Sequence, residues 1–457
     1  MKYEQFLETK QIKFSSKGKE VDPSDINPSL FDFQRDIVVW ALRKGRAAVF
    51  AGTGLGKTLM QCEWARHIGN VLIFAPLSVA YQTVSEGAKF GIKVKYCADQ
   101  SEVEDGICIT NYDRLEKFDI TTFDGIVLDE SSILKSMDGK TRTTLIKSCQ
   151  SIQYKLACTA TPAPNDITEL CNHAEFLGIM RQKEMLATFF VHDGGDTSKW
   201  RLKGHAVTSF WEWVSSWAVM LTNPSDLGYD GSKYILPPLH VISSVVESKR
   251  TDDDLFYLPA VTLQERQAAR RSTVEERAQR CAEIVAQHPN DQWLIWCNLN
   301  SESEMVAKLI EGSVEIRGSD TSKKKEQVAI DFANGKINVL VSKPLIFGMG
   351  LNFQSCHRMA FVGLSDSFEQ YYQSVRRCWR FGQENEVFVH IITADSEGTV
   401  VENIKRKELE FESMLKGMIA STQNITKNNI RPTKRDDVVY KPKMRMRIPD
   451  WLVPMPA

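Results

Sequence analysis

The sequence predicts an α/β protein made of two parallel-sheet units in tandem. Short apolar runs bounded by Gly, Pro, Asp or Thr alternate with stretches of helical spacing, and this alternation occurs in two separate parts of the chain. Such alternation is typical of parallel strands covered by helices on both faces. The 457 residues are 42% hydrophobic and 25% charged. This composition provides for more than one core and excludes disordered, collagen-like and disulfide-scaffold proteins.

The first predicted unit covers residues 30–178 and follows an N-terminal extension, residues 1–29. Its strand-like runs are short and apolar, at 47–50, 71–74, 107–109, 126–128 and 156–158. Stretches with helical spacing separate them, at 59–67, 79–90 and 141–149. We therefore expect a parallel sheet whose strands and helices alternate along the chain.

The second predicted unit covers residues 261–420 and begins with a charged helix near Leu263. Its strand-like runs lie at 293–296, 314–316, 339–341, 359–362 and 387–392. Between the units, residues 179–260 are interpreted as a partly helical insertion or linker, rich in tryptophan (Trp200, Trp211, Trp213 and Trp217). Because Trp213 and Trp217 are four residues apart, core packing is favoured over a base-stacking surface.

Residues 421–457 lose apolar periodicity and are expected to form a basic tail. Its basic residues between Arg431 and Arg447 could add salt-sensitive affinity for nucleic acid, or could simply be a solvated end. Over the whole chain, 57 Lys and Arg nearly balance 58 Asp and Glu. Any nucleic-acid surface must therefore come from local placement of basic residues.

The sequence also carries signals about its compartment. No apolar run approaches the roughly 20 residues that cross a bilayer, and the chain start has no pattern of a signal peptide or lipid anchor. The ten cysteines form no Cys-x-x-Cys pair, which indicates small buried side chains in a reducing, cytoplasmic protein without a membrane partner.

A phosphate-binding loop is the strongest local signal. Residues 51–58 read Ala-Gly-Thr-Gly-Leu-Gly-Lys-Thr, between a predicted strand and a predicted helix. The amides around Gly52, Thr53, Gly54 and Gly56 could surround phosphate oxygens at a helix start. Lys57 would lie against the β- and γ-phosphates of ATP, and Thr58 would ligate Mg²⁺. The alternative is a glycine-rich turn without a ligand.

A pair of acids ends the predicted strand at 126–128. Because ligands collect at the carboxyl ends of strands in open α/β sheets, Asp129 could hold Mg²⁺ and Glu130 could act as general base. The alternative is a solvated loop start. On the helix before the phosphate loop, Gln34 could offer its amide to the adenine edge, or could be a surface glutamine.

The second unit has no further Gly-Lys-Thr but carries a cluster of arginines. On a helix, Gln373, Arg377 and Arg380 would share one face, since they lie at positions i, i+4 and i+7. Arginine suits the charge that develops on a transferred γ-phosphate. A solvated basic face is the alternative, but aromatic residues interleave the cluster and favour a structured surface.

The order of these motifs resembles that of superfamily two helicases and translocases, and within them the short Swi/Snf-like ATPases of phages and bacteria. The matching segments, in chain order, are Phe33-Gln34, residues 51–58, 75–78, 109–112 and 129–132, residues 159–162 with Asn165, residues 348–352, and Gln373, Arg377, Arg380 and Gln383. The acid box reads Asp-Glu-Ser-Ser. It therefore lacks the final His that, in the family, links hydrolysis to the interface between the lobes.

The resemblance implies two RecA-like lobes, with ATP and Mg²⁺ in the cleft between them and a nucleic-acid strand across both. It implies that Arg377 and Arg380 complete the ATP site, with Gly350 and Gln373 beside the nucleotide. The residues that would grip the phosphate backbone are Ser78, Thr110, Tyr112, Thr161 and Asn352. The resulting hypothesis is a DNA-stimulated ATPase that translocates on DNA, in the cytoplasm of a bacterium or a phage-infected host. The alternatives are an RNA helicase, a P-loop phosphotransferase acting on a small substrate, and a non-enzymatic clamp.

Overall fold

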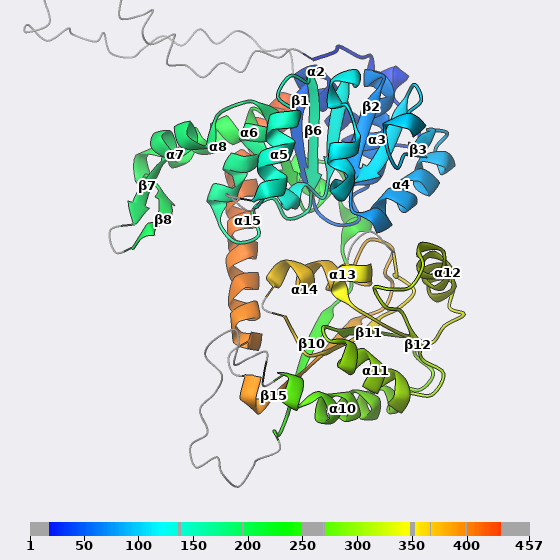
Figure 1. Ribbon diagram of the computed structural model, residues 1–457. Helices are drawn as coiled ribbons and strands as arrows, with labels where there is room; N and C mark the ends of the chain where they lie inside the picture. Colours follow the sequence, from blue (N-terminus) through cyan, green and yellow to red (C-terminus); the bar gives the residue numbers. More distant parts are fainter. Residues whose placement is uncertain are drawn as a thin grey trace, which may run out of the picture.

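The computed structural model describes residues 18–135, 139–193, 196–248, 268, 270–347, 352–365, 367–397 and 400–430. They form two α/β lobes, each built around a parallel sheet, with a smaller two-stranded antiparallel sheet projecting from the first lobe (Figure 1). The predicted fold class is therefore confirmed. The ten cysteines are free and buried, as their scattered positions predicted.

The first lobe contains a seven-stranded sheet of order β3-β4-β2-β5-β6-β1-β9. Its strands are β1 (Arg46–Ala51), β2 (Val71–Ala75), β3 (Val94–Tyr96), β4 (Ile107–Asn111), β5 (Gly125–Asp129), β6 (Tyr154–Thr159) and β9 (Ala218–Leu221). Its helices are α2 (Asp32–Lys44), α3 (Lys57–Ile68), α4 (Leu77–Lys89), α5 (Lys140–Ser148), α6 (Leu170–Leu177), α7 (Gln182–Phe189) and α8 (Val207–Ser215). The projecting hairpin is β7 (Phe190–Asp193) and β8 (Asp196–Leu202).

Two apolar cores cover the opposite faces of this sheet. Along β1, Ala48 and Phe50 belong to one core, whereas Ala47 and Val49 belong to the other. Because both faces are buried, a strand of this kind is apolar at every position. The short unbroken apolar runs in the sequence have this physical cause.

The second lobe contains a six-stranded sheet of order β10-β15-β14-β11-β13-β12. Its strands are β10 (Leu239–Val246), β11 (Trp293–Cys297), β12 (Val314–Glu315), β13 (Val339–Ser342), β14 (Arg358–Val362) and β15 (Val387–Ala394). Its helices are α10 (Val274–Ala286), α11 (Asn300–Leu309), α12 (Ser322–Ala333), α13 (Pro344–Phe347) and α14 (Phe368–Val375), and α15 (Val400–Ile430) follows them.

The boundaries expected at residues 178 and 260 do not coincide with the ends of the two sheets. Strand β9 completes the edge of the first sheet beside β1, and β10 pairs with β15 in the second. Both strands come from the stretch expected to be an insertion or linker. The predicted core packing of Trp213 and Trp217 is confirmed, since both are buried in the first lobe with ring centroids 5.4 Å apart.

Helix α15 also departs from the expected organisation, because it continues to Ile430, beyond the predicted start of the tail. Val400 and Phe411 are buried in a core of the second lobe, whereas Met418 and Ile430 are buried in cores of the first. Figure 1 shows the helix running from one lobe to the other. The basic residues from 431 to 447 lie outside the described residues.

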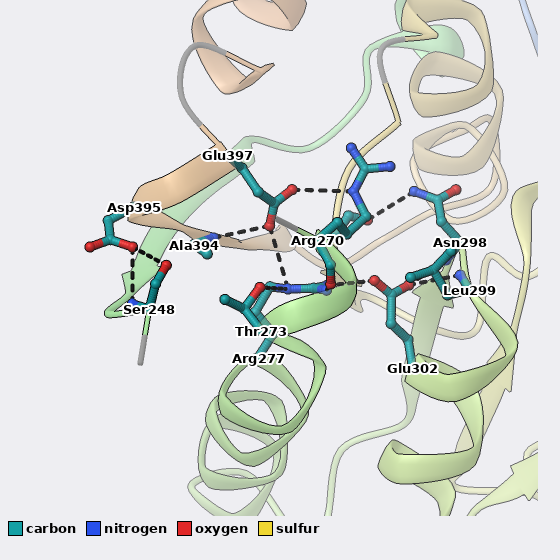
Figure 2. A network of polar contacts seen from close by, with 11 residues as sticks. Ser248, Arg270, Thr273, Arg277, Asn298, Leu299, Glu302, Ala394, Asp395 and Glu397 are labelled. Carbon is teal, nitrogen blue, oxygen red and sulfur yellow. Dashed lines mark hydrogen bonds and ion pairs between the residues drawn. The ribbon is translucent and has the colours of Figure 1, made fainter. Parts of the chain in front are cut away.

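A buried ionic network fixes the start of α10 in the second lobe (Figure 2). Arg277 pairs with Glu302 at 2.6 Å and with Glu397 at 3.4 Å, and all three side chains are fully buried. Arg270 pairs with the same Glu397 at 3.2 Å. Two guanidinium groups therefore face two carboxylates, so that no charge is left uncompensated out of water. The network joins the start of α10 to α11 and to the turn after β15.

Candidate nucleotide-binding and catalytic site

The predicted phosphate loop joins β1 to α3. Gly54 and Gly56 have φ values of 89° and 78°, which an L side chain adopts only with strain. The ammonium of Lys57 donates to the carbonyl oxygens of Ala51 (2.8 Å) and Gly52 (3.3 Å). Because α3 begins at Lys57, its amides and the positive end of its dipole meet at this loop. Thr53 and Thr58 are half-buried beside it.

Gln34 supports this loop from behind. Its Oε1 accepts from the N–H of Phe31 at 3.0 Å, and its Nε2 donates to the carbonyl oxygen of Leu55 at 3.0 Å. A Cβ on Gly56 would lie 2.2 Å from that Nε2. The amide that was expected to face the adenine edge is therefore bound to the protein backbone at both ends.

The acid pair lies at the carboxyl end of β5, as predicted. Oδ2 of Asp129 accepts from Nε2 of Gln61 at 2.8 Å, and its Oδ1 accepts from the N–H of Glu130 at 3.0 Å. Burial, together with the charge of Glu130, raises the pKa of Asp129 to about 6. Glu130 has a φ of 54° and is the only non-glycine residue with positive φ in the described part of the chain. Such a conformation costs about 1–3 kcal/mol and is typical of functional sites.

The oxygen atoms near Asp129 fit a hard divalent cation. Oε1 of Gln61 is buried without a hydrogen-bond partner among the described residues, and Thr58 lies at the start of α3. Oxygen ligands are those that Mg²⁺ prefers, and Mg²⁺ commonly uses one or two carboxylates plus substrate phosphates. Gln61 is thus a further residue of the candidate site. Its place opposite Asp129 could not be inferred from its position in a helix.

Three further residues hold the acid loop in place. The hydroxyl of Tyr112 donates to the carbonyl oxygen of Asp129 at 2.6 Å. Behind the loop, Ser131 Oγ lies 3.1 Å from Nε2 of His173, and Nδ2 of Asn172 donates to the carbonyl oxygen of Leu134 at 2.8 Å. Helix α6 thus supports the loop, although no motif in the sequence indicated it.

We expect acid to destabilise the protein through His173. Burial lowers the pKa of His173 from its ordinary 6.5 to about 4, so that between these values the unfolded chain binds a proton that the folded protein does not. The contribution of His173 to the free energy of unfolding should therefore fall as the pH drops through this window, by up to about 3 kcal/mol, whereas the raised pKa values of Asp129 and Glu169 act in the opposite direction. Denaturant unfolding at several pH values measures the slope.

His173→Gln should remove this contribution and so make the free energy of unfolding less sensitive to loss at low pH than in wild type, and the same substitution at the exposed His205 should not. A slope unchanged in His173→Gln would assign the acid sensitivity to another group.

The arginine cluster lies just after α14 rather than on it. The helix ends at Val375, so the expected common face of Gln373, Arg377 and Arg380 is not helical throughout. The side chain of Arg377 is nevertheless hydrogen-bonded to α14. Its Nε donates to the carbonyl oxygen of Gln373, and a terminal nitrogen donates to Oε1 of Gln373, both at 3.2 Å. Burial and the nearby Arg380 lower the pKa of Arg377 to about 9, and Glu130 opposes this shift.

Contacts between the lobes bring the arginine cluster to the phosphate loop. Nε2 of Gln373 lies 3.5 Å from Oε2 of Glu130. A Cβ on Gly54 would lie 3.0 Å from the backbone nitrogen of Phe381. Burial lowers the pKa of Lys57. The charges of Glu130 and Asp129 oppose this shift, and the charge of Arg380 adds to it. The charged residues predicted from both halves of the chain therefore lie together where the two lobes meet. Gly350 lies outside the described residues.

The residues expected to grip nucleic acid are mostly not at the surface. Thr110 and Thr161 are fully buried, and neither hydroxyl has a partner among the described residues. Tyr112 donates its hydroxyl to Asp129, and Asn352 accepts from Arg380. Direct phosphate contacts by the Thr110, Tyr112 and Thr161 hydroxyls are therefore incompatible with their places in the structure. The side chain of Ser78 lies outside the described part.

Parts of the chain are similar to known proteins. Residues 276–382 match the helicase conserved C-terminal domain, and this range includes Gln373, Arg377 and Arg380. A putative ATP-dependent RNA helicase, R290 of Acanthamoeba polyphaga mimivirus, is 26% identical over 106 residues, which are 22% of this chain. The match spans 19% of that relative's length.

A solved structure is similar over more of the chain. It is the Sulfolobus solfataricus SWI2/SNF2 ATPase core in complex with dsDNA, with a TM-score of 0.42 and 17% identity, covering 90% of this chain and 99% of that one.

Among the described residues, no helix is both long and apolar enough to span a bilayer. Residues 276–382 of the second lobe are thus similar to a helicase C-terminal domain, and the predicted resemblance to helicases is confirmed over that part of the chain.

Proposed function

We propose that this protein is a DNA-stimulated ATPase of the Swi/Snf-like kind, which hydrolyses ATP between its lobes and moves along DNA. The main support is the contact of Gln373 with Glu130 across the cleft, beside the approach of Phe381 to Gly54. A single-lobe phosphotransferase acting on a small substrate would not need a second lobe that reaches the phosphate loop. The short phage or bacterial form is part of the same proposal.

The residues of the proposed site would divide the tasks of ATP hydrolysis between them. Lys57 and the loop amides would hold the phosphates, and Thr58 with Asp129 would hold Mg²⁺, which neutralises charge on the β- and γ-phosphates. Glu130 would accept the proton of the attacking water. Arg377 and Arg380 would donate to the γ-phosphate oxygens as charge develops on them. Release of these contacts after hydrolysis would allow the lobes to separate and advance on the strand.

The decisive experiment measures ATP turnover at a stated salt concentration, alone and with single-stranded DNA, duplex DNA, forked DNA or RNA. We expect DNA to raise turnover more than RNA. Stimulation mainly by RNA would favour the RNA helicase, whereas phosphoryl transfer to a small acceptor without any polynucleotide would favour the phosphotransferase. Wild-type turnover that no nucleic acid stimulates would contradict the proposal.

We expect Lys57→Ala to weaken ATP binding by about 10- to 150-fold, since a hydrogen bond to a charged group contributes about 1.5–3 kcal/mol. Isothermal titration with ATP and Mg²⁺ measures the affinity. Lys416→Ala, at an exposed position of α15, serves as the matched control and should bind like wild type. Wild-type affinity in Lys57→Ala would exclude the loop as the ATP site.

A further inference from the structure

The lobes share a second polar contact, one helical turn before the contact of Gln373 with Glu130. The ammonium of Lys135 donates to the carboxylate of Glu369. Lys135 is the last residue of the 3-10 helix Ser131–Lys135, which directly follows the acid pair. Glu369 lies in the first turn of α14. The ion pair therefore joins the loop of the acids to the helix that precedes the arginine cluster.

Both contacts come from one face of α14, because residues four positions apart on a helix lie one above the other. Gln373 contacts Glu130, and Glu369 pairs with Lys135. Since α14 packs in the core of the second lobe, one contact alone would leave that lobe free to rotate about it relative to the acid loop. Two contacts a turn apart restrict both the position and the orientation of the helix. They also restrict Arg377, which is hydrogen-bonded to Gln373.

Contacts within the first lobe alone hold the backbone of Lys135 in place. Nδ2 of Asn172 lies 3.3 Å from the carbonyl oxygen of Lys135, and Oδ1 of Asn172 accepts from Nε of Arg142 at 3.0 Å. Asn172 is fully buried. The backbone at Lys135 is thus anchored from behind, and only its side chain extends to the other lobe.

The pair lies in a partly sheltered environment. The side chain of Glu369 is 15% exposed and that of Lys135 is 40% exposed, so the interaction is less screened than that of a freely exposed pair. Burial raises the pKa of the first-lobe residue Glu169 to about 7, and Lys135 opposes this shift. Lys135 therefore has a carboxyl group of its own lobe nearby as well as that of Glu369.

We propose that Lys135 and Glu369 are positioning residues, whose ion pair aligns α14 with the acid loop and so places Arg377 for ATP hydrolysis. This inference rests on the proposed function. It also accounts for the acid box, in which Ser132 stands where the family has its interface His: the link to the second lobe is made three residues later, by Lys135.

A double-mutant cycle tests the pair. We expect Lys135→Met and Glu369→Gln each to lower kcat for ATP about tenfold, with KM changed less than kcat, since coupled residues interact by about 0.5–3 kcal/mol. The double variant should be no slower than either single variant. Lys135→Arg, which retains the charge, should keep most of the turnover. Losses that multiply in the double variant would overturn the inference.

The control is the exposed pair Arg280–Glu283 on α10, a helix at the end of the second lobe away from the first lobe (Figure 1). Arg280→Met and Glu283→Gln should leave kcat unchanged. Hydrogen exchange gives a readout that does not depend on turnover. Either single variant of the cleft pair should speed exchange in α14, and the double variant should do so no further.

Two results separate this inference from the proposed function. If wild type turns over ATP with nucleic acid but the cleft variants match it in kcat and in exchange, the pairing role is wrong and the proposed function stands. If wild type shows no turnover, the proposed function fails, and normal exchange of α14 in the single variants would overturn the pairing role as well.

Discussion

Replacing Arg377 with alanine should lower kcat for ATP by about 10³- to 10⁵-fold, the range that arginine fingers contribute to phosphoryl transfer. The affinity for ATP should change little, because Lys57 and the loop of the first lobe would hold the phosphates in the ground state. The guanidinium would act mainly on charge that develops during the reaction, so its removal affects kcat rather than binding. Single-turnover hydrolysis and isothermal titration measure the two quantities separately.

The controls for Arg377→Ala address its burial, since the side chain is only 3% exposed. Arg377→Lys retains a charge in the same space but loses the fork that donates to two oxygens. It should remain folded by thermal unfolding and still be slow. An equal loss of ATP affinity in Arg377→Ala and Lys57→Ala would contradict the division of tasks between the lobes.

Glu130→Gln should lower kcat by about 10²- to 10⁴-fold, as expected when a general base is removed. Glutamine has nearly the same shape and still accepts a hydrogen bond, but it cannot take a proton from water. The change also removes the charge that raises the pKa of Asp129, so that pKa should fall. ATP and Mg²⁺ binding should therefore be kept.

Glu130→Gln is measured in the same turnover assay, with Glu102→Gln as its control. Glu102 is an exposed carboxylate of the first lobe, and its substitution should have no effect on kcat. Turnover in Glu130→Gln equal to that of wild type would revive the non-enzymatic clamp.

The arrangement of the proposed nucleotide site could largely be predicted from the sequence because its main parts are local. A phosphate loop needs glycines at backbone positions with positive φ, next to a lysine at a helix start, and all of these lie within residues 51–58. Asp129 and Glu130 end an apolar strand, which is again a local pattern. Gln61, Asn172 and His173 could not be predicted, since each acts through a partner distant in the sequence.

The burial of the residues expected to contact nucleic acid could not be predicted, because burial is a tertiary property. Thr110 and Thr161 lie at or just beyond the ends of strands, where polar residues commonly face a ligand. Here the neighbouring elements cover both hydroxyls, and Tyr112 is turned inward to Asp129. The end of α14 also depends on a tertiary contact. The carbonyl oxygen of Arg377 accepts from the N–H of Phe353, which holds the turn after the helix in place.

The path of α15 limits how the cleft can open. The stretch between β9 and β10 is one covalent crossing between the lobes, and α15 is another. Met414 touches cores of both lobes, and Gly417 follows within the same helix. Because α15 packs in cores of both lobes, the two lobes can separate widely only if this helix bends or leaves one of those cores.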